Sequence, residues 1–166
     1  MLLVILFYGR PGGSTIPRAD QAQLLINIWD LKHRLATTGL FLESESSHTL
    51  PQWRPWAVVS AKRRTILALH HLEWTWSIYN QYPTMTCFEL GPLPAPAPKY
   101  LWSEEDERRW EVEYRKWLRY WEDGGSFRMI EFFHINSDKG LDVRSESWLA
   151  EADEFGMMLM AEGECS

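Results

Sequence analysis

The chain has 166 residues, and its 17 basic and 23 acidic side chains give a formal net charge of −6 at pH 7. This length suits one domain, and the negative balance repels a phosphate backbone at long range, which disfavours direct binding of nucleic acid. The two cysteines are too few for a disulfide framework or a zinc site of several thiolates, and they fit a reducing compartment.

Aromatic side chains are unusually frequent, with ten tryptophans, six tyrosines and seven phenylalanines. Each ring removes a large apolar area from water when it is buried. A domain of this size does not need so many rings for its core. Some of them are therefore expected to face a partner or a further segment of chain.

Residues 1–18 form an atypical leader. The apolar run at 1–9 (MLLVILFYG) lacks a basic start and is too short to cross a bilayer, so no membrane segment is expected. Glycines and prolines in residues 10–18 then break any regular element. The main domain is predicted to cover residues 19–160, followed by a tail at 161–166.

The first predicted element is an amphipathic helix over residues 19–38. Four apolar residues recur in it at helical spacing: Leu24, Ile28, Leu31 and Leu35. Gly39 stands where a C-terminal cap is expected. The polar stretch that follows, residues 43–55, ends in prolines and is predicted to be a surface loop.

Residues 56–82 predict the central helix of the bundle. One apolar stripe consists of Val58, Ala61, Thr65, Leu72, Trp76 and Tyr79. A second stripe consists of Val59, Ile66, His70 and Trp74. Because apolar residues occur on most sides of this helix, it is expected to be buried between other helices.

Three consecutive cations, Lys62, Arg63 and Arg64, lie within this helix. An exposed cluster could contact phosphate or serve nuclear import. On a helix, however, the three side chains fan out over about 200 degrees. At least one guanidinium is therefore predicted to face a buried carboxylate from a neighbouring helix.

A proline-rich link, CFELGPLPAPAPKYLW at 87–102, follows the central helix. The alternating prolines fix their own backbone angles and keep the preceding residues extended. Their i, i+2 spacing lacks the P-x-x-P register that recognition grooves read, although a proline ligand is the alternative. The link is predicted to be an intramolecular strut that docks Leu101 and Trp102.

Ser103 is predicted to cap the next helix, with Asp106 in capping-box spacing. Its apolar face is Trp110, Tyr114, Trp117 and Trp121. Its polar face carries three pairs at four-residue spacing: Glu104 with Arg108, Glu105 with Arg109, and Glu111 with Arg115. A helix at 127–135 and a final helix, capped by Ser145 or Ser147 and running to Leu159, complete the prediction. The predicted fold is all-α: an irregular helical bundle with a proline-rich extended link between the core helix and the following helix.

Histidines and carboxylates suggest one candidate metal site. Its members would be His70, His71, Glu73, Glu131 and His134. Di-iron helical bundles need two E-x-x-H pairs and two further carboxylates, and only the pair at 131–134 has the right order. Hydrogen-bonded core histidines are therefore favoured, and no metal or cofactor is expected. A helical metal-carboxylate enzyme using His70, Glu73, Glu131 and His134 remains the alternative.

The sequence contains no recognisable motif for nucleophilic catalysis or for phosphate binding. Cys87 has no glycine elbow around it, and GRPGG at 9–13 lacks the lysine and hydroxyl residue of a phosphate loop. No catalytic residue is therefore assigned, and the chain is predicted not to be an enzyme.

Three stretches resemble a known family: RRTILALHHLEWTWSIYNQYP at 63–83, the proline-rich link, and DEFGMMLM at 153–160. They are similar to the fungal-specific transcription factor regulatory domain, the helical middle homology region found downstream of zinc-cluster or zinc-finger DNA-binding modules. The residues that match its pattern are Arg63, Arg64, Pro94, Pro96, Leu101 and Trp102. The resemblance covers roughly residues 21–160.

This resemblance implies regulation of transcription in the nucleus, through protein partners, missing segments of a parent factor or a small apolar effector. With two cysteines the chain cannot form the family's zinc cluster, so it is expected not to contact DNA itself. Residues 1–18 and 161–166 do not match the family, so the domain is expected to be incomplete, with exposed apolar faces. A non-functional truncated remnant is a further alternative.

Overall fold

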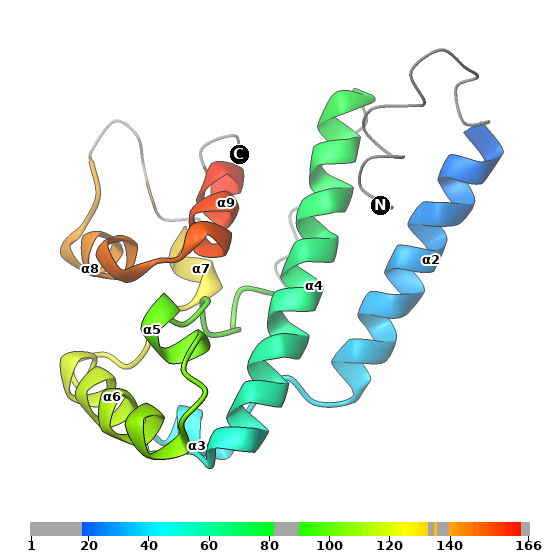
Figure 1. The fold of residues 1–166 in the computed structure, drawn as a ribbon. Coiled ribbons are helices and arrows are strands. Elements are labelled where there is room, and N and C mark those ends of the chain that lie inside the picture. The colour runs from blue at the N-terminus through cyan, green and yellow to red at the C-terminus, as the bar shows by residue number, and fades with distance from the viewer. Residues whose placement is uncertain (1–17, 82–89, 133–134, 136–139, 164–166) are drawn as a thin grey trace.

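The computed structural model describes residues 18–81, 90–132, 135 and 140–163 (Figure 1). The helices in it are α2 (Arg18–Thr37), α3 (Glu43–Ser46), α4 (Trp53–Tyr79), α5 (Lys99–Trp102), α6 (Glu107–Tyr120), α7 (Met129–Phe132), α8 (Val143–Glu151) and α9 (Glu154–Gly163). These described ranges contain no strand, which confirms the all-α prediction. None of their helices is long and apolar enough to span a membrane.

Helices α2 and α4 form a long antiparallel pair, with α4 between α2 and the C-terminal helices (Figure 1). Ile28 is the buried anchor of α2, whereas Leu31 is 45% exposed. Lys32 of α2 forms an ion pair with Glu73 of α4. Gly39 has a φ of +86°, the left-handed conformation that ends a helix and that glycine adopts without a steric penalty.

The buried face of α4 differs from the predicted one. Its buried residues are Trp56, Val59, Ser60, Arg63, Ile66, Leu67 and Trp76. Val59 and Ile66 of the second stripe are buried as predicted, but Val58 and Tyr79 of the first stripe are exposed by 55% and 71%. Apolar residues surround this helix, so periodicity alone cannot orient it. The side that carries Arg63 faces inward, where its guanidinium pairs with the buried Glu45 carboxylate.

The predicted loop at 43–55 is partly helical. Glu43–Ser46 form α3, and α4 begins at Trp53, before the proline that was expected to bound the loop. Proline is tolerated in the first turn of a helix, where its missing N–H has no partner to lose. Pro55 therefore lies in the first turn of α4 instead of preceding the helix.

Two apolar clusters make up the core. One contains Leu40, Ile66, Leu67, Leu93, Trp121, Phe127, Met129, Phe132, Trp148 and Leu159. The other contains Trp56, Leu101, Trp110 and Tyr114. Trp117 packs against both clusters, so α6 joins them through the predicted aromatic face. Trp56 and Trp110 have ring centroids 5.0 Å apart, a favourable tilted contact.

The described part of the proline-rich link is held within the molecule. The backbone N–H of Ala95 donates to the carbonyl of Phe127 at 2.8 Å, and that of Met129 donates to the carbonyl of Leu93 at 2.9 Å. Leu101 is fully buried at the end of the link. These are the contacts of an intramolecular connection. Residues 82–89, which include Cys87, lie outside the described part of the chain.

The predicted start of α6 is wrong by one turn. Asp106 is the N-cap and accepts the N–H of Arg109 at 2.9 Å, whereas the Ser103 hydroxyl donates to the Lys99 carbonyl and closes α5. An aspartate caps a helix as well as a serine does. The Ser103 hydroxyl is already bonded within α5, so Asp106 caps α6 instead. Glu104 is not in an ion pair with Arg108, because its carboxylate accepts the N–H groups of Glu105 and Asp106.

The final predicted helix is two helices. Asp142 caps α8 by accepting the N–H of Ser145 at 2.8 Å, so Ser145 is a donor and not the cap. Asp153 accepts the N–H of Gly156 at 2.8 Å and starts α9. The chain is extended at Ala152, between the two helices. The helix predicted at 127–135 is the single turn α7 in the described residues.

Candidate functional site

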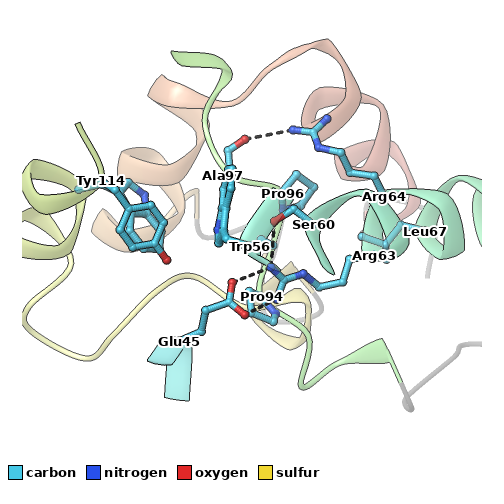
Figure 2. A pocket seen from close by; sticks show the side chains of 12 residues that line it. Glu45, Trp56, Ser60, Arg63, Arg64, Leu67, Pro94, Pro96, Ala97 and Tyr114 are labelled. Carbon is cyan, nitrogen blue, oxygen red and sulfur yellow. Dashed lines mark hydrogen bonds and ion pairs between the residues drawn. The ribbon is translucent and has the colours of Figure 1, made fainter. Parts of the chain in front are cut away.

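Two adjacent arginines in the middle of α4 form a connected polar site, named here the arginine centre. Arg63 donates to both carboxylate oxygens of Glu45 in α3, at 2.8 and 2.6 Å, and to the Ser60 hydroxyl at 3.2 Å (Figure 2). The side chains of Arg63 and Glu45 are only 7% and 9% exposed. The planar guanidinium therefore forms a buried two-pronged pair, which confirms the prediction of a buried carboxylate partner.

Arg64 extends to the other side of the helix. It lies 2.7 Å from Asp153 and donates to the Ala97 carbonyl of the link at 3.1 Å. Its guanidinium carbon is 4.5 Å from the ring centroid of Trp102 and 5.1 Å from that of Phe155. A cation over two aromatic rings gains from each ring's electron-rich face. Arg64 thus connects α4 to the link, to α5 and to α9.

A small cavity lies between the two arginines and the link, as Figure 2 shows. Its walls include Pro94, Pro96 and Tyr114, and its volume is about 20 Å³. That volume accommodates a water molecule, whereas pockets for small organic ligands measure about 300 to 1,000 Å³.

Burial raises the pKa of Tyr114 well above its usual range, and the nearby charge of Glu45 raises it further, so the phenol is neutral at pH 7.

All six residues that carry the family resemblance meet at or beside this centre. Pro94 and Pro96 line the cavity with the arginines, and the Pro96 carbonyl accepts the Trp148 indole N–H at 3.2 Å. Trp102 stacks with Arg64, and Leu101 lies in the neighbouring cluster. Residues that are far apart in sequence are therefore joined by direct contacts.

Sequence reasoning missed the two carboxylates of this centre. Glu45 lies in the stretch predicted to be a loop, and Asp153 lies inside the helix predicted to be continuous. A signal for Asp153 was present, because aspartate is a favoured N-cap residue and Glu154 supplies an acidic residue for the first turn that follows. Glu45 had no comparable local signal, since its partner is decided by the packing of α3 on α4.

The candidate metal ligands do not converge in the described residues, where no group of three histidine, cysteine or acidic side chains could hold a metal ion. Glu73 is paired with Lys32, and Glu131 accepts two hydrogen bonds from Arg144, at 2.8 and 3.1 Å. The ring of His71 stacks on Trp74. His134 lies outside the described residues.

The chain is matched by no protein-family model, by no curated protein and by no solved structure. Its function must therefore be argued from its own residues.

Proposed function

We propose that this chain is a regulatory domain of the kind found in fungal transcription factors, and that it acts in the nucleus by contact with other polypeptide. The arginine centre carries the proposal. Two of the residues that suggest the family hold other segments against α4: Arg64 contacts the link at Ala97 and the ring of Trp102, and Arg63 pairs with Glu45 of α3. This use of the motif supports a structural role for these residues in the domain.

The acidic residues considered for catalysis support a structural role. Glu73 joins α4 to α2 through Lys32, and Glu131 joins α7 to α8 through Arg144. A carboxylate that is committed to a neighbouring cation is poorly placed to act as a base or a metal ligand. We therefore favour an interaction domain over a metal-carboxylate enzyme.

Exposed apolar side chains on α2 support binding to a protein. Ile26 and Trp29 are exposed by 58% and 63%, and within the described residues Trp29 stacks on the exposed ring of His33. These residues lie three positions apart and therefore share a face of α2. Large exposed aromatic residues are typical of interface anchors.

A small apolar effector is a weaker part of the proposal. The cavity at the arginine centre holds about 20 Å³, and a second cavity beside Trp121 and Trp148 holds about 10 Å³. Neither can admit an organic molecule without rearrangement. Such an effector would have to bind at another surface, so protein partners are the preferred ligands.

The proposal is tested by fusing the chain to a DNA-binding module of known target and measuring a reporter gene in a fungal host. The fusion should change reporter transcription several-fold relative to the module alone. Trp29→Ser should abolish much of this effect, whereas Val143→Ser, at a position of α8 that is 77% exposed, should not. Equal reporter levels with and without the chain would contradict the proposal.

A further inference from the structure

The outer face of α6 carries a row of cations, named here the α6 basic face. Its members are Arg108, Arg109, Arg115, Lys116 and Arg119, all of which are exposed. Lys116 pairs with Glu113 at 2.7 Å. The four arginines form no ion pair with any residue in the described part of the chain, so the predicted pairs of Arg108, Arg109 and Arg115 are not formed.

The spacing of these residues aligns them along one side of the helix. Arg108, Val112, Arg115 and Arg119 follow one another at intervals of four, three and four, so the row is about 16 Å long. The opposite side of α6 is buried through Trp110 and Tyr114. Helix α6 lies at the periphery of the molecule (Figure 1), and the residues of this row are exposed.

Apolar and acidic residues give the α6 basic face a definite pattern. Val112 and Tyr120 are exposed by 53% and 57% among the cations. Carboxylates lie beyond both ends of the row, at 104–107 and at 122–123. The surface is therefore acidic, then basic with apolar contacts and with the partly buried Glu111 and Glu113 beside the row, then acidic again.

We propose that the α6 basic face binds an acidic helical segment of another protein. Guanidinium groups match carboxylates in geometry, and carboxylates at three- and four-residue spacing on a helix would meet successive arginines. Apolar side chains among them would contact Val112 and Tyr120. Basic residues at the two ends of the segment would meet the flanking carboxylates of this chain.

Duplex nucleic acid fits this surface less well. A phosphate backbone continues past both ends of the row and would meet the carboxylates at 104–107 and 122–123. The net charge of −6 adds repulsion at longer range. A short acidic segment with basic ends avoids both penalties.

The test is fluorescence anisotropy with the full chain and three labelled probes. The first is a helical peptide of about 20 residues, long enough to hold helical structure, with four glutamates at this spacing, leucines between them and lysines at both ends. The second peptide has glutamine for each glutamate. The third probe is a duplex of about 20 base pairs, whose length of roughly 68 Å carries its phosphates past both ends of the row.

The acidic peptide should bind, and the double variant Arg115→Gln with Arg119→Gln should lower the affinity of the chain for this peptide about tenfold. Arg108→Gln with Arg109→Gln should do the same. Arg34→Gln with Arg54→Gln removes as much charge from exposed sites on α2 and α4 and should leave affinity unchanged. The proposal is overturned if the glutamine peptide or the duplex binds as tightly as the acidic peptide, or if the Arg34 and Arg54 control substitutions weaken binding as much as the α6 substitutions do. This surface lies apart from Trp29, so its failure would leave the reporter result intact.

Discussion

Arg64 and Asp153 form an ion pair of 2.7 Å between the middle of α4 and the residue that starts α9. Their side chains are 13% and 7% exposed. The second oxygen of Asp153 accepts the N–H of Gly156. One carboxylate therefore caps a helix and also fixes that helix to the central one, which couples the start of α9 to the arginine centre.

Replacing Arg64 with alanine should strongly destabilise the domain. Asp153 would be left as a buried charge without its partner, and removing one member of a buried pair costs about 3 to 5 kcal/mol. The stacking on Trp102 and Phe155 would be lost as well. Urea denaturation followed by circular dichroism measures the change in the free energy of unfolding.

Arg34→Ala is the matched control for this prediction. Arg34 pairs with Asp30 at 2.8 Å, but their side chains are 76% and 54% exposed. Such pairs contribute about 0 to 1 kcal/mol. Similar losses of stability in the two variants would show that the arginine centre has no special structural role.

Gly156→Ala should destabilise the protein although it places alanine in a helix. A Cβ at this position would lie 2.9 Å from the Trp148 ring and 3.3 Å from the Ala152 side chain. Overpacking costs about 1 to 3 kcal/mol, which exceeds the gain of about 1 kcal/mol in helix propensity. A higher urea midpoint than that of the wild type would mean that α8 and α9 are not packed this closely.

Asp142 should contribute to the loss of stability in acid. Its pKa lies below the usual carboxyl range, chiefly because the side chain accepts the backbone N–H of Ser145. Its charged form therefore stabilises the fold above the unfolded pKa, and this contribution is lost as pH falls through the lower folded pKa.

Asp142→Asn keeps an oxygen acceptor for the cap but does not titrate. Its melting temperature should fall less than that of the wild type between about pH 5 and about pH 3. Asp123→Asn, at another exposed aspartate, should follow the wild type. If Asp142→Asn also follows the wild type, the cap does not stabilise α8 through its charge.

The purified chain should melt cooperatively and show dispersed amide resonances. Two connected apolar clusters and two buried ion pairs are expected to unfold together, as in a small domain. A broad, non-cooperative transition with narrow amide dispersion would instead favour the reading of the chain as a non-functional remnant.

The elements of this fold with strong local signals could be predicted from sequence. The aromatic face of α6 follows directly from helical spacing. That Arg63 and Arg64 pair with carboxylates follows from the cost of burying an unpaired cation. The break between α8 and α9 could not be predicted with the same ease, because the residues around Asp153 also suit a continuous helix.

Which face of α4 is buried, and which residue pairs with Arg63, both depend on tertiary packing. Apolar residues surround α4, so only the positions of its neighbours decide that Val58 faces solvent. Glu45 becomes a buried partner because α3 folds against α4, and short helices of this kind have little intrinsic signal. For the same reason, the unpaired cations of α6 could not be recognised until the positions of nearby carboxylates were known.

A double-mutant cycle on Arg64 and Asp153 tests the arginine centre most directly. Arg64→Met removes the cation but keeps much of the side-chain volume, and Asp153→Asn removes the charge but can still cap α9. The free energies of unfolding of the wild type, both single variants and the double variant give the coupling. We predict a coupling of about 2 kcal/mol or more, with the double variant more stable than the sum of the single losses implies. Additive losses, with a coupling near zero, would contradict the claim that this pair holds the C-terminal helices to α4.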